Sequence, residues 1–193
     1  MKAKTKAKIT VIAVLGSKDS GKTTTIEALT RELTRRGYRV AAVKHIPEKD
    51  FTIDTKGKDT WRFADAGAKT IVSISPKETA IIEKGETSNL TIEDVVEKCR
   101  DSDVILIEGF REILGKNPKV PKIVAVKSEE EVAEALKTFK PIIAFTGPYL
   151  AVEKDLPAPY FDVFRKQTEL VELVEKIIRE KRGFEVSLAE RPF

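Results

Sequence analysis

Long apolar runs and amphipathic stretches follow each other along this chain. The runs KITVIAVLG (8–16) and SDVILIEG (102–109) are apolar at most positions, which is typical of strands buried on both faces of a parallel sheet. Shorter apolar runs predict further strands at 38–45, 122–127 and 141–147. Between them, helical spacing of the apolar residues predicts helices at 22–37, 58–68, 91–100, 128–137 and 167–181. This alternation predicts an α/β fold with a mainly parallel sheet.

The region from residue 46 to residue 84 departs from this alternation. Residues 46–58 (IPEKDFTIDTKGK) mix Pro, Gly and charges and predict an exposed loop. Two short apolar segments, 69–75 and 79–84, predict a small β-hairpin with no obvious covering helix, and we hypothesise that they pair across subunits. We therefore expect one domain over 8–182, with a basic tail at 1–7 and a second tail at 183–193.

Composition narrows the class of protein. The chain has 193 residues, and its 35 basic residues nearly balance its 31 acidic ones. The lysines of MKAKTKAK are typical of a solvated end, so we expect no nucleic-acid partner. The single cysteine, Cys99, excludes a disulfide framework within the chain. No signal core or membrane-length apolar run is present, so we expect a soluble, cytoplasmic protein with no membrane partner.

Residues 16–23 (GSKDSGKT) match the Walker A pattern G-x-x-x-x-G-K-[ST], between a predicted strand and a predicted helix. The glycines of such a loop let successive N–H groups point at phosphate oxygens, beside the positive end of the helix. Lys22 is expected to face solvent and to serve catalysis by its charge, and Thr23 to bind Mg²⁺. The predicted nucleotide-binding residues here are Gly16, Ser17, Lys18, Asp19, Ser20, Gly21, Lys22, Thr23 and Thr24.

Two further segments carry candidate chemistry. Glu108 ends the apolar run DVILIEGF (103–110), where phosphate-binding proteins place an acidic residue near the metal. The long polar loop after the second strand holds Asp54, which is a candidate to bind Mg²⁺ or to orient a catalytic water. His45 is interpreted as a structural hydrogen-bonding residue, with a general base as the alternative. No guanine-reading Asn-Lys-x-Asp, arginine finger or water-positioning glutamine can be named, so any hydrolysis is expected to be slow.

Together these motifs resemble the MobB family of molybdopterin guanine dinucleotide biosynthesis proteins. The resemblance rests on GSKDSGKTT (16–24), VAAVKH (40–45), DVILIEGF (103–110) and PKIVAVK (121–127), and above all on IDTKGKDTWRFADAGAKTIV (53–72). It implies a P-loop NTPase-like three-layer sandwich, GTP and Mg²⁺ as ligands, weak GTPase activity and a homodimer. The implied partner is a MobA-type guanylyltransferase, with molybdopterin or molybdoenzyme apoproteins as further candidates.

Carried over by position, the resemblance places Thr23 and Glu108 near Mg²⁺ and assigns Asp54, Lys58 and Asp59 to a switch-like nucleotide-binding loop. A base-specificity loop is expected within 146–164. Where relatives carry further histidines after the Lys-His pair, this chain has Ile46, Pro47 and Glu48.

Two other interpretations use the same residues. An ATP-dependent small-molecule kinase or ligase, such as dethiobiotin synthetase, also pairs a P-loop with a strand that ends in Glu-Gly. It would need a pocket for an acceptor substrate, for which residues 110–120 (FREILGKNPKV) are the candidate. The second alternative is a nucleotide-dependent interaction switch with no link to molybdenum.

Overall fold

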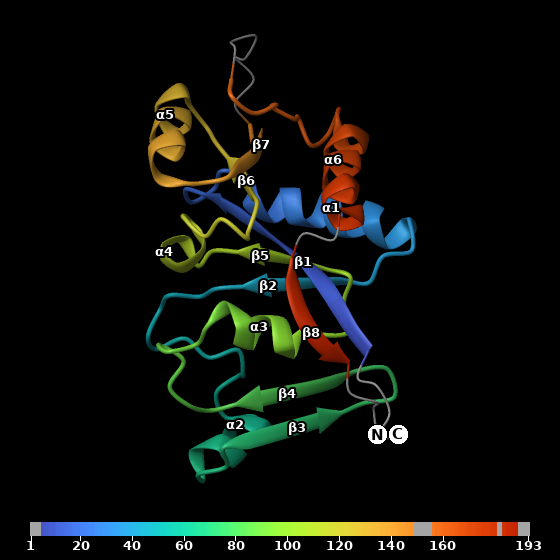
Figure 1. Ribbon diagram of the computed structural model, residues 1–193. Helices are drawn as coiled ribbons and strands as arrows, with labels where there is room; N and C mark the ends of the chain where they lie inside the picture. The colour runs from blue at the N-terminus through green and yellow to red at the C-terminus, as the bar shows by residue number, and fades with distance from the viewer. Residues whose placement is uncertain (1–4, 149–155, 181–182, 189–193) are drawn as a thin grey trace. The chain divides into compact units, whose positions relative to one another are not determined.

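The computed structural model describes residues 5–148, 156–180 and 183–188 (Figure 1). The chain divides into two units. The first unit comprises the residues up to His45 and those from Ile92 onward, and the second comprises Ile46–Thr91.

A mainly parallel sheet forms the frame of the first unit. Its strands lie in the order β2-β5-β1-β6-β7, and every neighbouring pair along this path is parallel. The carboxyl ends of these strands therefore meet at one edge of the sheet, and the predicted α/β fold is confirmed. The strand bounds are β1 Thr5–Gly16, β2 Val40–Lys44, β5 Val104–Glu108, β6 Lys122–Ala125 and β7 Ile142–Thr146.

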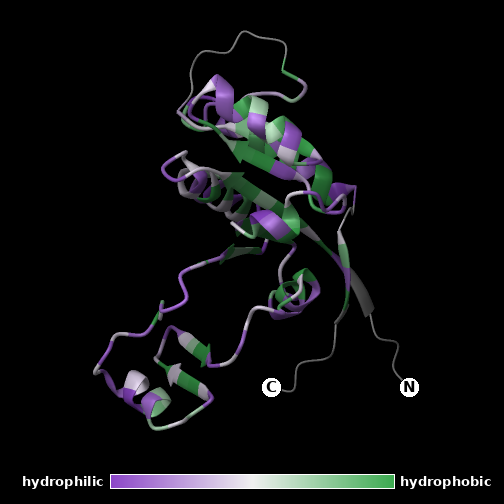
Figure 2. Cartoon of the chain, turned by 90° about the vertical axis from the view of Figure 1, so that its left-hand side faces the viewer, coloured by the Kyte–Doolittle hydropathy of each residue, from purple (hydrophilic) through white to green (hydrophobic). Residues whose placement is uncertain are grey.

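Helices cover both faces of this sheet. Helices α1 (Lys22–Arg35) and α6 (Gln167–Arg179) pack against one face, where alternate strand residues such as Ile12 and Leu106 meet Leu29 and Leu170. The intervening strand residues are buried as well, as expected when the opposite face is also covered. The remaining helices of this unit bury apolar residues of their own; they are α3 Ile92–Lys98, α4 Arg111–Leu114 and α5 Glu129–Thr138. Figure 2 shows the hydrophobic residues along the strands of the large sheet.

The two predicted tails take part in the sheet. Strand β8 (Phe184–Leu188) forms inside the segment predicted as the tail 183–193 and pairs antiparallel with Thr5–Ile9 of β1. Strand β1 likewise begins within the predicted tail 1–7. Just before β8, the backbone at Gly183 lies very close to that of β1. A Cβ on Gly183 would lie 2.0 Å from the Ile9 carbonyl oxygen, so only glycine fits there. A pairing between residues this far apart in sequence leaves no local signal.

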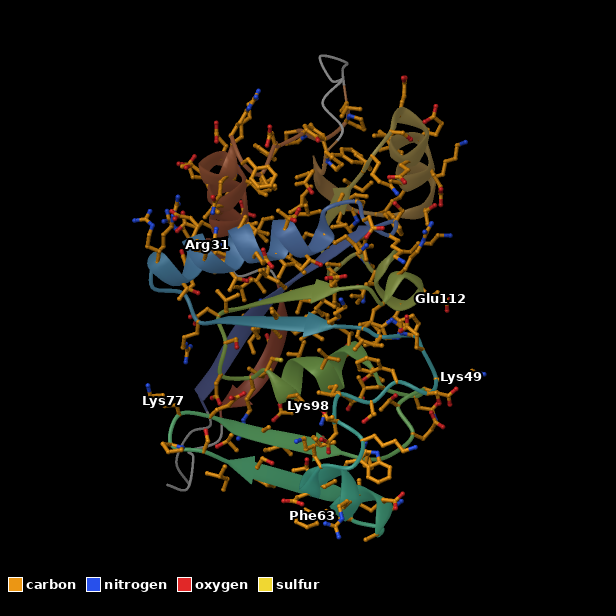
Figure 3. The ribbon with its side chains drawn as sticks, turned by 180° about the vertical axis from the view of Figure 1, so that it is seen from behind. Arg31, Lys49, Phe63, Lys77, Lys98 and Glu112 are labelled. Carbon is orange, nitrogen blue, oxygen red and sulfur yellow. The ribbon has the colours of Figure 1, made fainter. Side chains whose placement is uncertain are left out.

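The second unit consists of helix α2 (Asp59–Asp65) and the antiparallel hairpin of β3 (Thr70–Ile74) and β4 (Thr79–Glu83), as predicted from the two short apolar runs. All residues of this unit are described, and Ile71 is its one fully buried hydrophobic residue. Phe63, marked on α2 in Figure 3, is 57% exposed. The hydrophobic residues of this unit thus lie mostly at its surface.

Within the described ranges, the chain forms no helix that is both long and apolar enough to cross a membrane.

Candidate functional site

The glycine-rich loop joins the end of β1 to the start of α1. Gly16 and Gly21 adopt positive φ values of 148° and 93°, and Asp19 adopts 58°. A Cβ on Gly16 would lie 2.2 Å from the carbonyl oxygen of Ala125, so this position admits no side chain. Ser20 is buried and donates its hydroxyl hydrogen to the Ser17 carbonyl at 2.9 Å, which closes the loop on itself. The loop is therefore a tight, internally bonded turn rather than an open corner.

Helix α1 begins without the usual protection of its N-terminus. Its N-cap is Gly21, which has no side chain to accept a helix N–H, and its first turn contains no acidic residue. The first N–H groups and the positive end of the helix are therefore left for an external anion. The predicted ligand residues Thr23 and Thr24 lie in this first turn, exposed and half-buried respectively.

Lys22 does not face solvent, contrary to the expectation from the sequence. Its side chain is half-buried, and its ammonium group donates to the Ser17 carbonyl oxygen at 2.5 Å. The lysine bends back across the loop because the carbonyl is the acceptor within its reach. Its charge is thus already inside the turn where phosphate oxygens would enter.

Thr23 and Glu108 meet at the carboxyl edge of the sheet. The Thr23 hydroxyl donates to Oε2 of Glu108 at 3.0 Å, across 85 residues of sequence. The other carboxylate oxygen, Oε1, lies 3.8 Å from the ammonium nitrogen of Lys44 on β2. Sequence reasoning paired Thr23 with Glu108 but gave Lys44 no role, because its partner depends on the register of β2 against β5.

The glycine-rich loop is also held by Glu131 of α5 and by Lys127, which precedes that helix. Glu131 accepts from the Ser17 hydroxyl through Oε1 and from the backbone N–H of Lys127 through Oε2, each at 2.8 Å. The Lys127 ammonium donates to the Lys18 carbonyl at 2.9 Å. Glu131 and Lys127 were not predicted, since more than 100 residues separate them from the loop. They fix the first two residues after Gly16.

His45 makes an aromatic contact rather than the predicted hydrogen bond. Its ring stacks on Phe110, with 4.3 Å between centroids and 26° between planes, while its backbone N–H donates to the Glu108 carbonyl at 2.9 Å. Phe110 has a positive φ of 53°, and the preceding Gly109 lies so close to His45 that a Cβ would be 2.9 Å from that of the histidine. The stack thus fixes the backbone just after Glu108.

Strand β7 ends beside the glycine-rich loop. The hydroxyls of Thr146 and Thr25 are 3.0 Å apart, and a Cβ on Gly147 would lie 2.9 Å from the Ser20 carbonyl oxygen. The Tyr160 hydroxyl donates to the Gly147 carbonyl, and burial raises the pKa of Tyr160 to about 12. Of the expected base-specificity loop 146–164, residues 149–155 lie outside the described residues.

The other predicted ligand residues belong to the second unit. Asp54 accepts through Oδ1 from the Thr60 hydroxyl at 2.9 Å and from the backbone N–H of Thr55 at 2.8 Å, while its Oδ2 is buried without a hydrogen-bond partner. Lys58 is the exposed N-cap residue of α2, and Asp59 is the exposed first residue of that helix. The structure thus brings Lys22, Thr23 and Glu108 together in the first unit. The remaining predicted ligands, Asp54, Lys58 and Asp59, lie in the second unit.

The donor set around Glu108 suits Mg²⁺. A hydroxyl and a carboxylate are hard oxygen donors, and Mg²⁺ is usually bound by one or two such groups together with water and substrate phosphates. Among residues that the structure describes, no three His, Cys, Asp or Glu side chains are grouped to hold a metal. The residues present therefore fit a metal that arrives with a phosphate ligand, rather than an all-protein metal centre.

Comparison with known proteins identifies a family. Residues 11–147 match the sequence profile of MobB, described as molybdopterin guanine dinucleotide synthesis protein B. The molybdopterin-guanine dinucleotide biosynthesis adapter protein of Haemophilus influenzae is 32% identical over 124 residues, or 63% of this chain and 65% of that protein. A Methanocaldococcus jannaschii protein named for the same role is 38% identical over 122 residues, or 62% of this chain and 48% of that protein. These matches thus span about half to two thirds of the length of the curated relatives.

Solved structures agree with the sequence match. A crystal structure of molybdopterin-guanine biosynthesis protein B (MobB) superposes with a TM-score of 0.67 and 27% identity, over 88% of this chain and 99% of that one. The crystal structure of Bacillus subtilis MobB gives a TM-score of 0.64 and 26% identity, over 87% and 97% of the two chains. Because the family profile matches most of this chain and the fold is shared, this chain belongs to the MobB family.

Proposed function

We propose that this protein is an accessory (adapter) protein of molybdopterin guanine dinucleotide biosynthesis that binds GTP with Mg²⁺ and assists a MobA-type guanylyltransferase. One observation carries the proposal: Lys22 lies inside the glycine-rich loop while Thr23 and Glu108 are bonded at its mouth, 3.0 Å apart. Membership of the MobB family supplies the pathway. GTP is the nucleotide because the product of that pathway contains guanine.

Each residue of the loop has a proposed role. The backbone N–H groups of the turn surround the phosphates, and Lys22 leaves the Ser17 carbonyl to neutralise the β- and γ-phosphates. Thr23 and Glu108 bind Mg²⁺, directly or through water. The residues proposed to bind the nucleotide in this loop are Gly16, Ser17, Lys18, Asp19, Ser20, Gly21, Lys22, Thr23 and Thr24.

In the second unit, Asp54 is proposed to bind the metal or to orient a water molecule in hydrolysis. Its partnerless Oδ2 supports this role, because a buried carboxylate oxygen without a donor is costly unless a ligand or water satisfies it. Lys58 and Asp59, which follow in the same loop and are exposed, are proposed nucleotide contacts. Hydrolysis is expected to be slow, since no arginine finger or water-positioning glutamine can be named in the sequence. We propose that the protein works in the cytoplasm.

The kinase or ligase alternative gains little from residues 110–120. Arg111, the cation of α4, is bound to Glu134 at 2.5 Å and lies over the ring of Phe139. Leu114 and Val120 are fully buried. The charge of Arg111 is thus already paired with a residue of α5, and no acceptor pocket needs to be assigned to this segment.

Calorimetric titration with GTP and with ATP, each with Mg²⁺, tests the proposal. We expect tighter binding of GTP; a preference for ATP would favour the kinase or ligase alternative, and no binding of either would refute nucleotide binding. Lys22→Ala should weaken GTP binding by roughly tenfold to 100-fold, because charge-assisted hydrogen bonds to phosphate are lost. Lys137→Ala, a change at an exposed lysine in the last turn of α5, is the matched control.

We further propose that the protein is a homodimer joined through the β3–β4 hairpin. Val72 and Ile81 are register partners on one face of the hairpin, and Ile74 continues that face. They are 51%, 63% and 79% exposed, although a two-stranded hairpin needs cover to be stable in water. A second copy of the same face would supply that cover.

Light scattering at micromolar concentration should report a dimer, and Ile81→Lys should yield a monomer. Ile113→Lys, at an exposed isoleucine of α4 in the first unit, serves as the control and should remain dimeric. A monomeric unsubstituted protein would contradict this proposal.

A further inference from the structure

We infer that Lys44 sets the metal dependence of nucleotide binding, because its ammonium group neutralises Glu108 until a divalent cation displaces it. The inference rests on the proposed function, in which this edge of the sheet receives a nucleoside triphosphate with Mg²⁺.

Strand register brings the two side chains together. Lys44 and Glu108 are the last residues of the parallel neighbours β2 and β5 and are register partners. Registered residues of adjacent strands project from the same face of a sheet, so lysine and carboxylate emerge side by side. The ammonium nitrogen lies 3.8 Å from Oε1, while Oε2 accepts from Thr23. One oxygen of the carboxylate therefore has a cation and the other a hydroxyl.

The two partners differ in exposure, which makes the lysine easy to displace. The side chain of Glu108 is 14% exposed and that of Lys44 is 62% exposed. A half-enclosed carboxylate benefits from a nearby positive charge, whereas a largely solvated ammonium loses little when it moves into water. A lysine offers a point charge and no bidentate fork, so it holds the carboxylate in no fixed geometry. A divalent cation with two charges would win this competition.

Among the residues that the structure describes, Lys44 is the cation that pairs with Glu108, and the neighbouring cations have other partners. Lys22 is bound to the Ser17 carbonyl, and Lys127 to the Lys18 carbonyl. His45, next to Lys44, has its ring stacked on Phe110. Within the described parts of the chain, the ion pair at Glu108 is formed by Lys44.

Opposite effects with and without metal follow from this arrangement. Without Mg²⁺, Lys44 cancels the charge of Glu108 and so reduces its repulsion of the incoming phosphates. With Mg²⁺, the metal takes over that carboxylate, and the displaced ammonium repels the metal. Removing the lysine charge should therefore weaken metal-free binding by about fivefold and leave binding with Mg²⁺ equal or tighter, since two charges about 4 Å apart that water screens interact on that scale.

The test measures GTP affinity of the full chain by calorimetry, once in excess EDTA and once in excess Mg²⁺. Lys44→Met should raise the ratio of the affinity in Mg²⁺ to the affinity in EDTA at least about fivefold. Lys44→Arg keeps the charge and should restore the ratio of the unsubstituted protein. Lys137→Met, an exposed lysine on α5, should leave the ratio unchanged. In a Glu108→Gln background, Lys44→Met should no longer alter the ratio, because the group it neutralises is gone.

An unchanged ratio in Lys44→Met, with GTP still bound, would overturn this inference and leave the proposed function standing. The inference is overturned in the same way if Lys44→Met alters the ratio equally in the Glu108→Gln background. Failure of the unsubstituted protein to bind GTP would instead remove the proposed function and this inference together. Thermal unfolding of each variant checks that the exposed substitution has left the fold intact, and Lys44→Gln gives a second neutral variant.

Discussion

Strands β5 and β3 are both five residues long and both mainly apolar, yet they are buried very differently. In β5, the residues Val104–Ile107 are fully enclosed between two layers of helices. In β3, Ile71 is buried, but Val72 and Ile74 are exposed. Apolar sequence alone therefore does not decide burial, because a strand is enclosed only when other elements cover both of its faces.

The two units differ in the same way in how much hydrophobic core each one has. The first unit has a continuous core that can hold the glycine-rich loop in a strained shape. The second unit has one fully buried hydrophobic residue, Ile71, among its 46 residues from Ile46 to Thr91, all of them described. A unit of this size with so little buried apolar area is unstable alone. It is suited to gain stability from a partner.

The largest expected effect contrasts the buried core of the first unit with the exposed hairpin of the second unit. Leu106→Ala removes a fully buried side chain that packs with α1 and α6, and should lower the free energy of unfolding by about 3 kcal/mol. Ile74→Ala, at a 79% exposed position of β3, should change it by less than about 0.5 kcal/mol at low protein concentration. Urea unfolding of both variants measures this contrast. Equal losses would mean that the second unit has a core of its own.

The next prediction compares the cost of an alanine substitution at one glycine of each unit. Gly16→Ala would place a Cβ 2.2 Å from the Ala125 carbonyl oxygen, whereas a Cβ on Gly57 would meet nothing within 4 Å. Both positions have positive φ, so both alanines carry backbone strain of about 1 kcal/mol. Gly16→Ala should cost about 2 kcal/mol more in unfolding free energy and abolish GTP binding. If Gly16→Ala binds GTP normally, the loop is less tightly packed than the contacts indicate.

A buried lysine predicts an alkaline gain in stability. Lys122 is fully buried on β6 and donates to the carbonyls of Asn117 and Lys140, and burial lowers its pKa to about 8. The unfolded chain keeps this proton up to an ordinary lysine pKa near 10.4. Between these values the unfolded state binds more protons, so folding stability should rise with pH, by up to about 3 kcal/mol.

Thermal unfolding from about pH 7 to about pH 10.5 measures this rise. It should be absent in Lys122→Met and unchanged in Lys77→Met, which alters an exposed lysine at the hairpin turn of the second unit. A rise of the same size in Lys122→Met would assign it to other groups.

The smallest effect compares one surface ion pair from each unit. The Arg39 guanidinium, 2.7 Å from Asp103, lowers the pKa of that carboxyl. The stability this gives is present above the unfolded pKa of about 3.9 and is lost as the pH falls through the folded value. Asp103→Asn should cost about 0.5 kcal/mol at neutral pH and nothing in strong acid, because both partners are partly exposed.

Asp59→Asn is the counterpart in the second unit. Its pair with Arg62 is longer, at 3.7 Å, and more exposed. This variant should cost less still at neutral pH, as followed by urea unfolding. A larger loss than that of Asp103→Asn would reverse the ranking of the two units.

Local sequence patterns account for most of the first unit. The continuous apolar runs predict β1 and β5, and the helical stripe of Leu29 and Leu33 predicts α1. Strand β8 could not be foreseen, because its only ladder among the described residues is with residues 5–9 at the other end of the sequence. The burial of Lys122 could not be foreseen either, since a charge inside an apolar run normally marks an exposed edge.

The candidate site likewise contains residues that the sequence predicts and residues that it does not. Spacing alone places Lys22 and Thr23 at the start of a helix, and the rule that ligands bind at the carboxyl ends of parallel strands brings in Glu108. Lys44 and Glu131 were not predicted because their partners depend on strand register and on the packing of α5. The orientation of Lys22 was wrongly predicted, because a carbonyl within its own loop accepts the charge that solvent was expected to receive.

The β1–β8 pairing also decides how the molecule responds to mechanical load. Thr5 and Leu188 are register partners at one end of an antiparallel pair, so a force applied to the two chain ends opens that pair one hydrogen bond at a time. The load then reaches the part of β1 that lies between the parallel strands β5 and β6, whose bonds must shear together. A force–extension trace would show a weak early event and a strong later one. The β1–β8 pair thus separates first when the chain ends are pulled, before the tension reaches the glycine-rich loop at Gly16.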